Sequence, residues 1–114
     1  MTDERWQQLL EEFRAAEASV LGDKRQDYAP GVDRLTNFRT VAAFAGMTMS
    51  QVAYTYLLKH IQAIGIATAE PITPKQWCLT KPNGAEGLKQ RVVDARNYLL
   101  LLAACIEEEA EAGL

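Results

Sequence analysis

The strongest constraint on the fold is an unbroken run of eight apolar residues, 99–106, that directly follows a polar segment, residues 91–98. On a helix, eight consecutive apolar residues cover every face, so we expect this helix to be buried on several sides. The polar side chains one or two turns earlier then lie beside a core, where an unpaired charge is costly. Asp94 and Asn97 are therefore the first candidates for a functional site.

The length and composition predict one globular helical domain spanning residues 1–114. Hydrophobic residues make up 48% of the chain and charged residues 24%, which is ordinary for a globular protein. The net charge of −3 argues against a general nucleic-acid or membrane-surface binder. The longest apolar run is too short to span a bilayer, and the amphipathic start does not resemble a secretory signal. We therefore expect a cytoplasmic protein without membrane contact.

Three helices are predicted in the first part of the chain. Apolar residues recur at helical spacing over residues 3–21, 35–45 and 48–67. Gly22 and Gly46 follow the first two of these segments, and we expect them to end the helices because glycine is the usual residue after a helix C-terminus.

Capping residues also mark the helix starts. Asp33 or Thr36 is expected to cap the second helix, since a short oxygen-bearing side chain can accept from an unpaired backbone N–H. Thr48 and Gln51 match a capping box at the start of the third helix. Gly65 weakens the last turn of that helix by about 1 kcal/mol relative to alanine.

A long loop and a long last helix complete the chain. Residues 68–83 contain three of the four prolines, and loops of this length are often functional or mobile. The last helix is expected over residues 85–110, with apolar residues alternating four and three apart in a heptad-like seam. The seam consists of Leu88, Val92, Ala95, Leu99, Leu102 and Ile106. The predicted fold is all-α, a four-helix bundle-like domain with a long loop before the last helix.

Four short segments, in a fixed order, carry a resemblance to a known family. They are residues 24–28 (KRQDY), 33–38 (DRLTNF), 56–60 (YLLKH) and 94–99 (DARNYL). Together they resemble small phage and prophage proteins related to the nucleotide-modification-associated domain 1 family, which is distantly MazG-like. The resemblance implies a helical protein in the cytoplasm of a bacterial host, linked to nucleotide metabolism or DNA modification. The chain departs from the family pattern at Ala29, where a glycine often follows the tyrosine.

The residue types in these segments suit a nucleotide or a related phosphorylated small molecule. Arginine and lysine bind phosphate, tyrosine stacks on a base, and asparagine reads a polar edge. We expect Arg34 and Lys59 to contact phosphate and Tyr28 to stack. Asp94 and Asn97 would position these groups or bind the polar edges of the ligand. The full set of candidate ligand-binding residues is Asp27, Tyr28, Arg34, Asn37, Lys59, His60, Asp94 and Asn97.

Each candidate also has a purely structural explanation. Asp94 can pair with an arginine and fix the register of the helix. Lys59 can extend to solvent along its own methylene groups, and a lone histidine such as His60 is more often a hydrogen-bonded interior residue than a catalyst. The acidic run at residues 107–109 is most simply a solvated face, and its charge opposes the helix dipole, so we expect that end to fray.

A second function class remains open, in which the chain is a protein-interaction module that acts on a host protein without a ligand. Such a module needs an exposed apolar patch, whereas a ligand site needs converging polar groups. Under either function, the last helix has more apolar surface than the other short helices are expected to cover. This favours a homodimer.

Other functions gain less support from the residues. A MazG-type pyrophosphatase holds Mg²⁺ with carboxylates three residues apart, but Arg91 stands three residues before Asp94. We therefore assign no metal ligand, and the cofactor stays unknown. Residues 40–52 resemble a helix-turn-helix, but the second helix has few basic residues, which disfavours a nucleic-acid partner. No catalytic residue is assigned, because no nucleophile has a neighbouring base.

Overall fold

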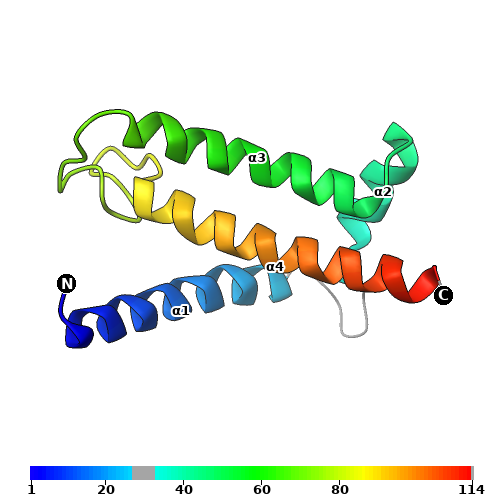
Figure 1. The fold of residues 1–114 in the computed structure, drawn as a ribbon, viewed down its shortest axis with the longest axis horizontal. Coiled ribbons are helices and arrows are strands. Elements are labelled where there is room, and N and C mark those ends of the chain that lie inside the picture. Colours follow the sequence, from blue (N-terminus) through cyan, green and yellow to red (C-terminus); the bar gives the residue numbers. More distant parts are fainter. Residues whose placement is uncertain (27–32, 114) are drawn as a thin grey trace. The chain divides into compact units, whose positions relative to one another are not determined.

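The computed structural model describes residues 1–26 and 33–113. Within them it shows four helices, α1 (Asp3–Gln26), α2 (Thr36–Ala45), α3 (Met49–Thr68) and α4 (Leu88–Ala112) (Figure 1). The described residues contain no strand, only one isolated antiparallel bridge between Thr80 and Glu86. The predicted all-α class, the four helices and the long loop before the last one are confirmed.

The chain divides into two compact units, Met1–Arg34 and Leu35–Leu114. Among the described residues, no helix is both long and apolar enough to cross a membrane. The prediction that residues 1–114 form one domain stays a prediction.

The first unit consists of α1, which begins where the hydroxyl of Thr2 accepts a hydrogen bond of 3.1 Å from the backbone N–H of Arg5. The helix continues past Gly22 to Gln26, so the expected stop at Gly22 is wrong. A glycine inside a helix costs about 1 kcal/mol but ends the helix only where the backbone turns left-handed.

In the second unit, α3 and α4 run antiparallel side by side, with α2 at one end of the pair (Figure 1). The antiparallel register is marked by two contacts, Ser50 with Glu109 at one end and His60 with Tyr98 further along. Apolar side chains from all three helices form the core of this unit. The buried core residues are Leu35, Phe38, Ala42, Val52, Ala53 and Cys105.

The turn between α2 and α3 follows the sequence prediction. Gly46 ends α2 in the left-handed region at φ 68°, and the α3 capping box is complete. Thr48 Oγ1 accepts from the N–H of Gln51 at 3.2 Å, and the Gln51 side chain accepts from the N–H of Thr48 at 2.9 Å. The predicted cap of α2 by Asp33 or Thr36 is wrong, because the N-cap residue is Leu35, whose side chain makes no capping hydrogen bond.

The acidic end of α4 is not simply a solvated face. The Glu109 carboxylate accepts hydrogen bonds from the backbone N–H of Ser50 at 2.9 Å and from its hydroxyl at 2.7 Å. Glu108 forms an ion pair with Arg39 of α2. Carboxylates are stabilised at a helix N-terminus by the unpaired N–H groups and the helix dipole. Glu109 therefore binds the start of α3 and fixes one end of the α3–α4 pair.

The apolar run on α4 is only partly buried in the single chain. Cys105 is fully buried, but Leu99, Leu100 and Ile106 expose 51%, 62% and 52% of their surface. The expectation of burial on several sides is therefore wrong for one chain. The reason is that α2 and α3 both approach one side of α4, the side marked by Tyr98 and Cys105.

The loop between α3 and α4 is held by backbone hydrogen bonds. The N–H groups of Leu88 and Lys89, at the start of α4, donate to the carbonyls of Gln76 and Cys78 at 2.9 and 3.2 Å. Gly87 is buried against Cys78, so closely that a Cβ atom at this position would overlap the Cys78 carbonyl. This packing starts α4 at Leu88, three residues later than the sequence pattern predicted.

A pair of glycine substitutions tests this packing. We expect Gly87→Ala to destabilise the protein severely, because the added methyl group overlaps the backbone of Cys78. Gly65→Ala should stabilise it by up to about 1 kcal/mol, since a Cβ there meets no atom within 4 Å and a glycine inside α3 is removed. Chemical denaturation followed by circular dichroism measures both changes. Similar stability of the two variants would contradict the close approach at Gly87.

A second substitution tests the link between α4 and α3. The hydrogen bonds from Ser50 hold the pKa of Glu109 below its ordinary value, so the charged form contributes stability above the usual glutamate range. We expect Glu109→Gln to cost about 1 kcal/mol at neutral pH, the size of a lost cap. This difference should vanish as the pH falls through the pKa of the folded protein. Glu107→Gln, an exposed neighbour, is the control and should change stability little at either pH.

Candidate functional site

The polar side chains that the structure brings together lie between α3 and the first half of α4. We call them the His60 cluster, which consists of His60, Glu86, Arg91, Asp94 and Tyr98. His60 lies three residues after buried Leu57, on the α3 face that packs against α4. Asp94 and Tyr98 are four residues apart and therefore share one face of α4. The helical spacing of both chain segments thus produces the cluster.

Aromatic rings connect the cluster to the core. The His60 ring stacks on Tyr98 with centroids 5.1 Å apart and an interplanar angle of 28°. Tyr98 meets Tyr56 edge-on at 6.1 Å, and Tyr56 contacts Phe38 of α2 at 6.0 Å. This series of rings orients the imidazole from one side.

One imidazole nitrogen of His60 is left without a hydrogen bond. Nδ1 is buried and has no partner among the described residues. Buried polar atoms in folded proteins are nearly always paired with protein, water or a ligand. An oriented imidazole with an unused nitrogen can accept a hydrogen bond from, or donate one to, a small molecule.

Hydrogen bonds also orient the carboxylate of Asp94. Gln90 Nε2, one turn earlier on α4, donates to Asp94 Oδ1 at 2.9 Å. Arg91 instead lies 3.5 Å from the carboxylate of Glu86, in the loop before α4. The structural alternative in which Asp94 pairs with an arginine is therefore replaced by pairing with an amide. The second carboxylate oxygen of Asp94 is in no hydrogen bond described here, and the cluster holds both signs of charge.

The electrostatics of the cluster favour a neutral imidazole. Burial lowers the pKa of His60 below its ordinary value; the Asp94 carboxylate opposes this shift and Arg91 adds to it. Burial also raises the pKa of Tyr98, and the negative charge of Asp94 acts in the same direction. At neutral pH the cluster thus presents an uncharged imidazole and a protonated phenol beside the carboxylate of Asp94.

Of the residues predicted from sequence, the structure brings His60 and Asp94 together. Lys59, the neighbour of His60 on α3, is exposed. Asn97 is buried on α4 at 7% exposure, and its side-chain Nδ2 has no partner in the described residues. Both residues lie on the same helices as the cluster. Besides burial, the charge of Lys59 lowers the pKa of His60, whereas no described contact joins Asn97 to the cluster.

The remaining predicted residues lie elsewhere in the chain. Asn37 is in the first turn of α2, next to Phe38, which contacts Tyr56 rather than His60. Arg34 belongs to the first unit, Met1–Arg34, and Asp27 and Tyr28 lie outside the described residues. The structure therefore brings together the α3–α4 part of the predicted site.

Sequence reasoning left four neighbours out of the candidate set: Glu86, Gln90, Arg91 and Tyr98. Gln90 and Tyr98 lie four residues before and after Asp94, so their spacing could have placed them on its face. Glu86 precedes the helix and carries no such signal. Across the described ranges 1–26 and 33–113, no group of three or more His, Cys, Asp or Glu side chains could hold a metal ion.

Comparisons with known proteins add nothing to this geometry. Family models, curated proteins and solved structures were all searched, and none of them gives a significant match to this chain. The resemblance to the nucleotide-modification-associated domain 1 family therefore depends on its four sequence segments alone.

The electrostatics can be tested on one resonance, because His60 is the only histidine in the chain. We expect an NMR titration of its ring protons to give a pKa below about 6.5, the value of a free histidine. Asp94→Asn should lower this pKa further, because it removes the carboxylate that stabilises the imidazolium. Arg91→Gln should raise it. Glu70→Gln, a change of an exposed carboxylate after α3, should leave it unchanged. A pKa insensitive to Asp94 would contradict the electrostatic effect of this carboxylate on His60.

Proposed function

We propose that this chain is a phage or prophage protein of the bacterial cytoplasm that binds a nucleotide or a related phosphorylated ligand. The observation that carries the proposal is the buried Nδ1 of His60, which is unpartnered among the described residues and lies in a cluster with Arg91 and Asp94. Ligand sites combine apolar and aromatic walls with a few converging polar groups, and the His60 cluster has this composition.

The cluster residues suit different parts of such a ligand. Arg91 offers a guanidinium for a phosphate group, in exchange for its 3.5 Å contact with Glu86. Asp94, oriented by Gln90, can accept hydrogen bonds from an amino group or a ribose hydroxyl. Lys59 adds an exposed positive charge on the same helix as His60.

The residues outside this part of the structure keep their proposed roles. Arg34 would contact phosphate and Tyr28 would stack on a base, with Asp27 and Asn37 as further polar contacts. Asn97 would position the ligand-binding groups on α4. The proposal is for binding, and it assigns no catalytic step and no metal.

A second candidate function has an observation of its own. Several large apolar side chains on α3 and α4 are 43–62% exposed, among them Leu58, Ile61, Leu99 and Leu100. Exposed apolar surface of this kind is typical of protein interfaces. It supports the proposal that the chain forms a homodimer, and equally the alternative in which it is an interaction module for a host protein.

A thermal-shift screen tests the ligand proposal. Purified protein is heated with ribonucleotides, deoxynucleotides and cyclic nucleotides, each with and without Mg²⁺. A ligand at 100 times its Kd adds about 2.7 kcal/mol, which raises the Tm of a domain of this size by several degrees. The shift should be lost in Asp94→Asn and Arg91→Gln and kept in Lys75→Gln, a change in the exposed loop. No shift with any probe would reject the ligand proposal and favour the interaction module.

A further inference from the structure

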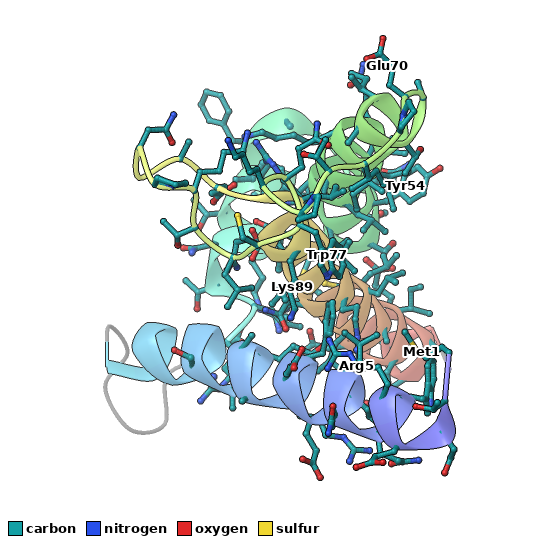
Figure 2. All side chains as sticks on the ribbon, turned by 90° about the vertical axis from the view of Figure 1, so that its left-hand side faces the viewer. Met1, Arg5, Tyr54, Glu70, Trp77 and Lys89 are labelled. Carbon is teal, nitrogen blue, oxygen red and sulfur yellow. The ribbon has the colours of Figure 1, made fainter. Side chains whose placement is uncertain are left out.

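One edge of α3 is apolar, uncharged and exposed. Tyr54, Leu58 and Ile61 are spaced four and three residues apart, so they form one stripe along the helix, and they expose 52%, 43% and 48% of their surface. Figure 2 shows Tyr54 on the side of α3 that is opposite to α2. Helix faces in contact with water normally carry charged residues, and Lys59 is the only lysine, arginine or acidic residue of α3.

A second apolar stripe, on α4, adjoins the first. Glu108 bonds to α2, and the next positions round the helix, Tyr98 and Glu109, contact α3. At 100° per residue, Leu102 comes next in the same direction, followed by Ile106 and Leu99. These three residues therefore lie beside α3 on the side away from α2. Leu102 is partly buried against the core of its own chain, whereas Leu99 and Ile106 are 51% and 52% exposed. We call the two stripes together the apolar face, which consists of Tyr54, Leu58, Ile61, Leu99, Leu102 and Ile106.

The apolar face occupies the middle of the α3–α4 pair. Its residues span positions 54–61 of α3 and 99–106 of α4, so at 1.5 Å per residue and two helix widths the face is roughly 12 Å long and 20 Å wide, or about 240 Å². The largest apolar patch on a typical monomer is about 300–600 Å², and a standard interface buries about 800 Å² on each partner. The apolar face alone is therefore smaller than a standard interface, so a partner that covers it must also contact the polar residues around it.

We propose that a second copy of this chain covers the apolar face, with the two copies related by a two-fold axis that makes the four helices α3 and α4 of both copies one bundle. This gives the homodimer proposed above its surface and its symmetry. It does not require the His60 cluster to bind a ligand.

The register of α3 and α4 makes the apolar face complementary to itself. Because Ser50 is level with Glu109 and His60 with Tyr98, Leu58 is level with the midpoint between Leu99 and Leu102. The two-fold axis lies at this level, in the plane of the apolar face and perpendicular to the helices. The stripe on α3 and the stripe on α4 are then both centred on the axis. Leu58 then meets Leu58 of the partner subunit, and Leu99 approaches Leu102 of the partner subunit. Residue-by-residue reciprocity of this kind is what a two-fold interface requires.

The charges on α4 favour the same antiparallel arrangement. Lys89, Arg91 and Arg96 lie in its first half with one carboxylate, Asp94, whereas Glu107, Glu108, Glu109 and Glu111 lie in its second half. Arg91, Glu108 and Glu109 already have partners within the chain, and the attraction between copies is assigned to Lys89, Arg96, Glu107 and Glu111. The two-fold axis places the basic half of each α4 beside the acidic half of the other, so the charges attract. A parallel arrangement would place the glutamates of both chains together. In this arrangement Arg96 lies within one helical turn of the level of Glu107 of the partner subunit. These two residues are therefore the pair to test.

The first test is the mass in solution. Light scattering at about 100 µM protein should give twice the 12.7 kDa of one chain. Leu58→Glu should be a folded monomer, because the new carboxylates meet at the axis while the side chain is already 43% exposed in one chain. Phe44→Glu, which changes a 95% exposed residue on α2, is the matched control and should stay dimeric. A monomeric parent protein, or a dimeric Leu58→Glu variant, would overturn the proposal.

A second test does not depend on the folding of Leu58→Glu. Under mild oxidation Leu58→Cys should form a disulfide between two chains, whereas Phe44→Cys at the same concentration should not. Arg96→Glu and Glu107→Arg should each weaken the dimer at least several-fold, and the double exchange should restore it. Failure of Leu58→Cys to link, or failure of the double exchange to restore the dimer, overturns the arrangement. The ligand-induced thermal shift should survive in the Leu58→Glu monomer, so loss of the dimer and loss of the ligand site are distinguished.

Discussion

The pairing of α3 with α4 is the interaction on which the rest of the described structure depends. Its register is set at one end by the carboxylate of Glu109 on Ser50, and further along by the stacking of His60 on Tyr98. The capped start of α3, the ring series that reaches Phe38 of α2 and the cluster around Asp94 all follow from this register. A shift of one residue along either helix would turn the polar side chains of the cluster away from each other.

Local patterns predicted the helices well. Apolar spacing gave four helices, and the glycine stop at Gly46 and the capping box of Thr48 with Gln51 depend on residues close in sequence. The continuation of α1 past Gly22 was missed, because glycine permits a helix end without imposing one. The bonds of Glu109 join residues 59 positions apart, and no local pattern carries that information.

The same distinction holds for the candidate site. Polar residues inside apolar helices identified His60 and Asp94 correctly as neighbours of a core, and helical spacing brought them together. The partner of Asp94 could not be predicted, because it depends on the conformation of the loop before α4. This loop places Glu86 beside Arg91, and Gln90 is the residue that donates to Asp94. The degree of burial of Leu99 was misjudged, because eight apolar residues in a row say how much surface needs covering but not which chain covers it.

The bonds between Glu109 and Ser50 also bear on the order in which the molecule folds. The hairpin of α2 and α3 is closed by a short turn and a cap whose partners are three residues apart, so it loses little chain entropy when it forms. Docking of α4 requires the ends of a much longer segment to meet, and distant contacts of this kind form slowly. Closing the hairpin of α2 and α3 therefore has the lower entropic cost, and the imidazole of His60 and the carboxylate of Asp94 come near each other only when α4 docks on α3.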